Sequence, residues 1–184
     1  MIGRAVAAGV PFAWFTADEA YGQAKYLQAW LEDQDVSYVM AIRRSDTLTT
    51  STGEQRADAL ISAVSGRAWQ RLSTGAGAHG PRESGWARIP VRDRWRPGRG
   101  HWLLARRPVS DPAEIAYYAC YGSRRSSTAD LAWVAGSRWH IGGVFPAGQG
   151  RGRAGSLPGP VLAGLACPHH LVHARPGLAV GQQG

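Results

Sequence analysis

The sequence of 184 residues predicts an α/β fold interrupted by a β-rich insertion and followed by a disordered tail. An apolar run at 10–15, typical of a buried strand, ends close to the acidic Asp18 and is followed by helical spacing of apolar residues. We therefore expect Asp18 at the carboxyl end of a strand that pairs in parallel with the strand near 36–42. Strand-like segments alternate with turns between 86 and 121. Residues 142–184 hold eleven of the 24 glycines and five of the 11 prolines, which disfavours regular structure there.

The individual elements follow from periodicity and turn signals. Tyr26, Leu27, Trp30 and Leu31 recur at intervals of three and four residues, which predicts a helix. Ser127 or Thr128 is suited to cap the last helix. The glycine-rich Gly75 to Gly80 lacks the Gly-Lys-Ser/Thr sequence of a phosphate loop, so it predicts a turn entering the insertion. In chain order we expect a strand at 11–17, a helix at 22–34, a strand at 36–43, a helix at 54–64, strands at 86–91, 101–107 and 114–121, and a helix at 127–141.

Composition limits the location of the chain. The hydrophobic content of 44% is close to the globular average. No run approaches the roughly eighteen apolar residues needed to cross a bilayer, and the first residues do not resemble a signal peptide. Cys120 and Cys167 are too few for a disulfide scaffold and suit a reducing compartment. We therefore expect a cytoplasmic protein without membrane contact.

The net charge of +8 comes almost entirely from arginine, because Lys25 is the one lysine beside twenty arginines. Ten of these arginines lie between 67 and 107, against two acidic residues in that range. Such a concentration attracts phosphate groups, and Trp86, Trp95 and Trp102 lie among the arginines at positions from which they could stack on bases. In the alternative interpretation, the tryptophans form a core and the arginines a solvated face.

The segment from Thr16 to Gly22, Thr-Ala-Asp-Glu-Ala-Tyr-Gly, resembles the second aspartate motif of DDE transposases from bacterial insertion sequences of the 701-type family. In that family the motif also follows a core strand. Further segments similar to the family, in the same order and spacing, are 26–32, 37–42, 75–82, 86–88, 100–107 and 131–141. The resemblance therefore covers 1–141.

This resemblance implies a partial ribonuclease-H-like core in 1–141, with the insertion at about 45–125, and a function in DNA cleavage and strand transfer during transposition. Asp18 is then a catalytic and metal-binding aspartate. Oxygen ligands suit the Mg²⁺ or Mn²⁺ that the family uses. Glu19 is better interpreted as the first-turn acid of the following helix than as a second metal ligand. The implied partners are DNA at transposon ends and an intact transposase.

The chain departs from the family pattern at both ends. The first family aspartate lies on a strand upstream of Met1, and Gly142 and Gln149 occupy the positions of the family's glutamate and lysine. A reading-frame change after Ile141 would explain the composition of 142–184, so we expect a fragment truncated at its N-terminus with an out-of-frame tail. With one carboxylate of three, the chain should bind no metal productively and should be inactive. The alternatives are a non-catalytic basic DNA-binding remnant and a pseudogene product.

The expected DNA contacts are arginines of the insertion and one near the end of the last helix. Arg138 precedes the family's glutamate by one helical turn. His101 and His140 are expected to have structural or DNA-contacting roles, since the family relies on metals rather than histidine. Cys167, His169, His170 and His173 resemble zinc ligands but fall in the tail, so no zinc site is expected. The predicted DNA-binding residues are Arg82, Arg88, Arg92, Arg94, Arg96, Arg99, Arg106, Arg107 and Arg138.

Overall fold

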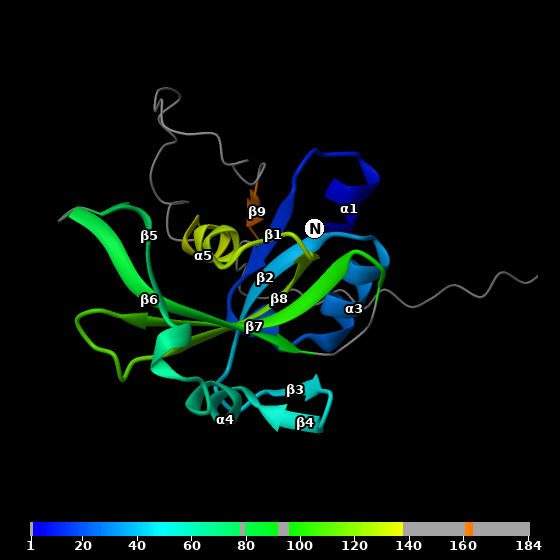
Figure 1. Cartoon of the computed structure of the whole chain (residues 1–184). Coiled ribbons are helices and arrows are strands. Elements are labelled where there is room, and N and C mark those ends of the chain that lie inside the picture. Colours follow the sequence, from blue (N-terminus) through cyan, green and yellow to red (C-terminus); the bar gives the residue numbers. More distant parts are fainter. Residues whose placement is uncertain (1, 78–79, 92–95, 138–160, 164–184) are drawn as a thin grey trace, which may run out of the picture.

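The structure, a computed structural model, describes residues 2–77, 80–91, 96–137 and 161–163, and gives only the backbone at 75–77, 80–82 and 161–163. One mixed sheet runs through the molecule, with helices on both of its faces and a small hairpin beside it (Figure 1). The elements are α1 (Ile2–Ala7), β1 (Trp14–Ala17), α2 (Glu19–Gly22), α3 (Lys25–Asp33), β2 (Ser37–Ile42), β3 (Thr47–Thr50), β4 (Gly53–Arg56), α4 (Ala57–Ser62), the 3-10 helix η1 (Gly66–Ala68), β5 (Gln70–Gly77), β6 (Gly80–Val91), β7 (Arg99–Pro108), β8 (Ala116–Ser123), α5 (Thr128–Ser137) and β9 (Val161–Ala163).

The sheet has the strand order β5-β6-β7-β8-β2-β1-β9. Strands β5 to β8 form an antiparallel meander, and β8 pairs antiparallel with β2. Strand β1 pairs in parallel with β2, Trp14 opposite Ser37 and Ala17 opposite Met40. As a result β1, β2 and β7 all end at the same edge of the sheet, which we call the carboxyl end; the opposite edge is the amino end.

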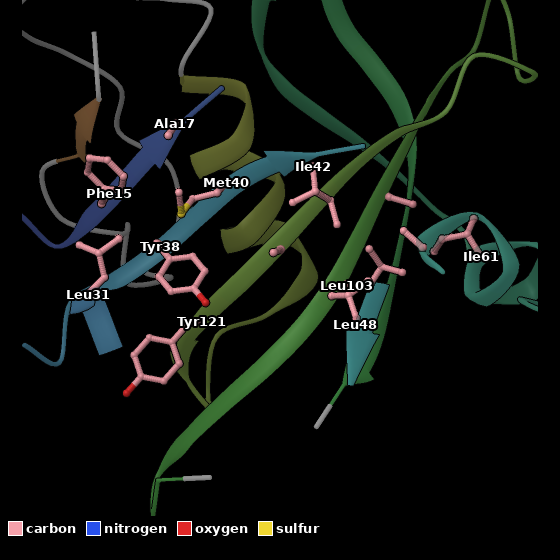
Figure 2. Close-up of a cluster of buried hydrophobic side chains, with 13 residues drawn as sticks. Phe15, Ala17, Leu31, Tyr38, Met40, Ile42, Leu48, Ile61, Leu103 and Tyr121 are labelled. Carbon is pink, nitrogen blue, oxygen red and sulfur yellow. The ribbon is translucent and has the colours of Figure 1, made fainter. Parts of the chain in front are cut away.

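Side-chain alternation along the strands gives the sheet a core on each face. Tyr38 and Met40 of β2 point to one face, and Val39 points to the other. The first face is covered by α3, α4 and the β3–β4 hairpin, which contribute Leu31, Leu48 and Ile61 (Figure 2). The second face is covered by α5 through four buried side chains: Leu131, Ala132, Val134 and Ala135. Burial on both sides makes the central strands nearly continuous apolar runs, as the sequence shows.

The mixed α/β class predicted from the sequence is confirmed, and most of the expected elements are present with shifted bounds. The helix expected at 54–64 is wrong in its first turn, since Gly53 to Arg56 form β4. Gly53 adopts a φ of 109°, which closes a tight hairpin and which L side chains rarely adopt. Strand β5 was not expected; Gly75 to Gly77, interpreted as a turn, belong to its end, and Gly80 begins β6.

The structure places parts of both the predicted insertion and the predicted tail in the main sheet. Strands β5 to β8 continue the same sheet as β2, so the segment at 45–125 contributes directly to the core of the fold. In the tail, Val161–Ala163 form a strand that pairs in parallel with β1, so the prediction of a disordered tail is wrong for these three residues. The other tail residues lie outside the described ranges. None of the helices in the described ranges has the length and apolarity needed to span a membrane.

Candidate functional site

Asp18 directly follows β1 at the carboxyl end of the sheet, beside the parallel strand β2. This is the position that the sequence predicted. Its carboxylate Oδ1 accepts a hydrogen bond from the backbone N–H of Ala20 at 3.2 Å, so Asp18 caps α2. A cap of this kind stabilises a protein by about 1 kcal/mol. Asp18 therefore has a structural role in this fold in addition to any chemical one.

Gly22, the last residue of the same motif, fixes the position of α2 against the sheet. A Cβ at this position would lie 1.6 Å from the backbone oxygen of Ala41 on β2, a distance at which atoms overlap. The buried side chain of Gln28 donates from Nε2 to the carbonyl oxygen of Gly22 at 2.7 Å. The motif thus combines a cap, a close approach of α2 to β2 and a hydrogen bond to α3, and together these place Asp18 at the carboxyl end.

Glu19 lies in the first turn of α2, as predicted. Its Oε1 accepts from Nε of Arg43 at 3.1 Å, and both side chains are more than half exposed. An exposed ion pair of this type contributes between about 0 and 1 kcal/mol. Glu19 is therefore held by an arginine rather than turned toward Asp18 as a second ligand of one metal ion.

A cleft of about 460 Å³ opens at the carboxyl end. It lies where β1 and β2 end, where β8 begins and where β7 ends. The charged residues that line it are Asp18, Glu19, Arg44, Arg106 and Glu114. The place of Glu114 in this site was not predictable from a local sequence motif. Because β8 runs antiparallel to β2, the residues before β8 reach the edge at which β2 ends, although they are remote from it in sequence.

The cleft does not offer the ligand set of a two-metal nuclease. Among the described residues there is no group of three or more histidine, cysteine, aspartate or glutamate side chains placed to hold a metal ion. Two divalent ions about 4 Å apart need several carboxylate oxygens between and around them. The residues present therefore do not fit the Mg²⁺ or Mn²⁺ pair that the resemblance implies.

Two of the predicted DNA-binding arginines are engaged inside the protein. Arg88 donates from Nη1 to the carbonyl oxygen of Ser126, and its guanidinium lies 5.2 Å from the ring centroid of Trp102. Arg99 donates from Nη2 to the carboxylate of Asp35 and lies over the ring of Tyr121. These contacts join β6 to the segment before α5, and β7 to the segment before β2. Both guanidinium groups therefore stabilise the fold through contacts within the protein.

The other arginines predicted to bind DNA lie in different parts of the molecule. Arg96 is exposed, Arg106 lines the cleft, and Arg107 is half-buried one residue further along β7. For Arg82 only its place in β6 is described. Arg92, Arg94 and Arg138 lie outside the described residues.

The tryptophans of the insertion belong mainly to the core. Trp86 and Trp102 are 1% and 7% exposed, which agrees with the core interpretation and leaves neither ring free to stack on a base. Trp95 lies outside the described residues.

His101 and Cys120, the histidine and the cysteine among the described residues, are both buried. His101 has Nε2 3.4 Å from Oε1 of Glu32, and its ring centroid is 4.9 Å from that of Tyr121. This position fits a structural role rather than contact with DNA. Burial raises the pKa of the Cys120 thiol, which disfavours the reactive thiolate. His140 and the zinc-like tail residues, Cys167, His169, His170 and His173, lie outside the described residues.

Comparison of the chain with family models, with curated proteins and with solved structures finds no match.

Proposed function

We propose that this chain is part of a DDE transposase with a ribonuclease-H-like core, and that it binds DNA without cleaving it. The observation that carries the proposal is the position of Asp18, at the end of a parallel strand and at the wall of an open cleft. Ligand sites in open α/β sheets lie at the carboxyl ends of their strands. The sequence motif and this position therefore agree on the same residue.

DNA binding is supported by the charge around the cleft. Arg44 and Arg106 line it beside Asp18 and Glu114, and the chain as a whole carries a net charge of +8. Guanidinium groups bind phosphate in a bidentate manner, and each neutralised phosphate releases counterions. A phosphodiester backbone that runs past the carboxyl end would lie beside Arg44 and Arg106.

The absence of cleavage follows from counting ligands in the cleft. Asp18 and Glu114 supply two carboxylates from different elements, and Glu19 is paired with Arg43. Losing part of the carboxylate set leaves two divalent ions without enough oxygen ligands to fix their geometry. DNA bound at the cleft is therefore expected to remain intact.

A cleavage assay tests this account. The purified wild-type chain and the variants Asp18→Ala and Glu114→Gln are each incubated with transposon-end DNA and an excess of Mg²⁺ or Mn²⁺. We expect no product from any of the three proteins. Cleavage by the wild-type chain that Asp18→Ala or Glu114→Gln abolishes would show that the cleft is a complete site and would overturn the proposal of a non-cleaving chain.

The second candidate is a basic DNA-binding remnant unrelated to transposition, favoured by the excess of arginine alone. The DNA that flanks the coding sequence separates the two candidates. Codons for a further aspartate strand upstream, and for a glutamate-bearing helix in another frame after codon 141, are expected for a transposase fragment. Flanking DNA with neither feature would remove the transposase proposal and leave the remnant.

A further inference from the structure

Arg107, near the end of β7, is held on an aromatic ring. Its guanidinium carbon lies 4.1 Å from the ring centroid of Trp69, the residue that precedes β5. Cation–π contacts of this kind are worth about 0.5–1 kcal/mol at exposed sites and hold the guanidinium against the ring. Trp69 is itself half-buried against the core of the α3 and α4 face. The ring is therefore a firm support for the arginine.

Gly85 on β6 provides the space in which Arg107 lies. The register places Gly85 opposite Arg107 on one side and opposite Arg71 of β5 on the other. A Cβ at Gly85 would come within 3.1 Å of both Cγ and Nε of Arg107 and within 3.5 Å of the Trp69 ring. The missing side chain thus forms a shallow notch across which Arg107 extends. Arg71 and Arg107 flank the notch with their Cα atoms about 10 Å apart, two strand spacings.

Arg107 differs from the other half-buried arginines in its hydrogen bonding. Arg88 and Arg99 each donate to an oxygen of the protein. Arg107 makes no hydrogen bond or ion pair within the described ranges, although part of its side chain is withdrawn from water. A guanidinium carries five N–H donors in a fixed fork that matches phosphate and carboxylate oxygens. A guanidinium that is held in place and has no acceptor in the protein supplies N–H donors that an anion can accept from.

From these contacts we infer that Arg107, supported by Trp69 across the notch at Gly85, binds a phosphate of the DNA backbone. The inference rests on the proposed DNA-binding function and names one site within it. Arg71 is available as a second donor. Its Nη2 lies 2.7 Å from Oε2 of Glu83, but both side chains are exposed, so this ion pair contributes only about 0 to 1 kcal/mol to stability. Arg106, the preceding residue of β7, points to the opposite face of the sheet and lines the cleft with Asp18, so the Arg107 site lies on the other face of the sheet from Arg106.

The test measures the affinity of the full chain for a fluorescein-labelled DNA duplex by fluorescence anisotropy at low salt. Arg107→Gln removes the five guanidinium donors and should weaken binding about 10-fold or more, the loss expected for one charge-assisted hydrogen bond. Gly85→Ala keeps every charge but displaces the side chain of Arg107, and should weaken binding about 3-fold or more. Arg56→Gln is the matched control: it removes the same formal charge from an arginine already paired with Asp58, and should change affinity less than 2-fold.

Circular dichroism confirms that each variant is folded before its affinity is compared. If the wild-type chain binds DNA and Arg107→Gln binds equally well, the site is wrong while the proposed function stands. Equal losses for Arg107→Gln and Arg56→Gln would mean that net charge alone matters, which also overturns the site. If the wild-type chain binds no DNA, the proposed function fails. Binding of polyglutamate that depends on Arg107, without binding of DNA, would assign the site to an acidic protein partner and overturn the inference.

Discussion

The two ends of strand β7 carry arginines with opposite roles. Arg99 at the amino end donates to the carboxylate of Asp35, lies within 3.4 Å of Ser37 Oγ and covers the ring of Tyr121. Arg107 at the carboxyl end rests on an aromatic ring but has no oxygen acceptor among the residues that the structure describes. Arg99 thus stabilises the fold at one end of β7, whereas Arg107 at the other end has N–H donors available for a ligand.

This difference shows why a count of arginines is a poor guide to a DNA-binding surface. What matters is whether an acceptor inside the protein already occupies the guanidinium. At the amino end the acceptor exists because Asp35 ends the turn after α3 with a φ of 57°, a conformation that aspartate tolerates. At the carboxyl end the nearest partner of Arg107 is an indole, which supplies no oxygen.

The largest effect is expected from a change that displaces the carboxyl end itself. Gly22→Ala should lower the free energy of unfolding by at least about 3 kcal/mol, because the new Cβ overlaps the Ala41 carbonyl and forces α2 away from β2. Urea denaturation measures the change. Gly66→Ala is the control, since a Cβ there meets nothing within 4 Å. Equal stability of the two variants would contradict the proposed fit of α2.

The next prediction compares how much Arg99 and Arg107 contribute to the free energy of unfolding. Arg99→Gln should cost about 2 kcal/mol, because it removes a charge-assisted hydrogen bond and a ring contact and leaves Asp35 without its cation. Arg107→Gln should cost about 0.5 kcal/mol, the value of its ring contact alone. Thermal or urea unfolding of both variants checks the order. A larger loss for Arg107→Gln would mean that its role is structural.

A smaller effect concerns pH at the amino end. The hydrogen bond from Arg99 holds the pKa of Asp35 below its usual range. A lowered pKa in the folded state gives stability that is present above the unfolded pKa of about 3.9 and is lost as pH falls through the folded value. Because the Asp35 side chain is half exposed, solvent screening limits the contribution to about 0.5–1 kcal/mol.

Asp35→Asn tests this contribution while keeping a residue that accepts the positive φ. The variant should be less stable than the wild type at pH 7, and the difference should shrink below about pH 4. Unfolding curves recorded from about pH 2 to about pH 7 measure the change, because this range includes the unfolded pKa of about 3.9 and lower values. A difference that stays constant to the acid end of this range would show that Arg99 and Asp35 do not interact as an ion pair.

Much of the fold was predictable because it depends on local pattern. The apolar runs before Asp18 and within β7 and β8 predicted strands that the structure contains, and the parallel pairing of β1 with β2 places Asp18 as expected. The partners of the charged groups were not predictable. Arg99 meets Asp35 across 64 residues of sequence, and Glu114 reaches the cleft through the register of β8. Register depends on the packing of the whole sheet, which no local pattern records.

The function proposed for the carboxyl end is tested most directly by the salt dependence of DNA binding. The observed association constant of the wild-type chain for a DNA duplex is measured between about 50 and 200 mM salt, where each phosphate contact contributes a slope of about −0.9 to log K against log salt. Arg44, Arg71, Arg106 and Arg107 together predict a slope between about −2 and −4. A slope near zero, or no binding at the lowest salt, would contradict the account of this end as a surface for the DNA backbone.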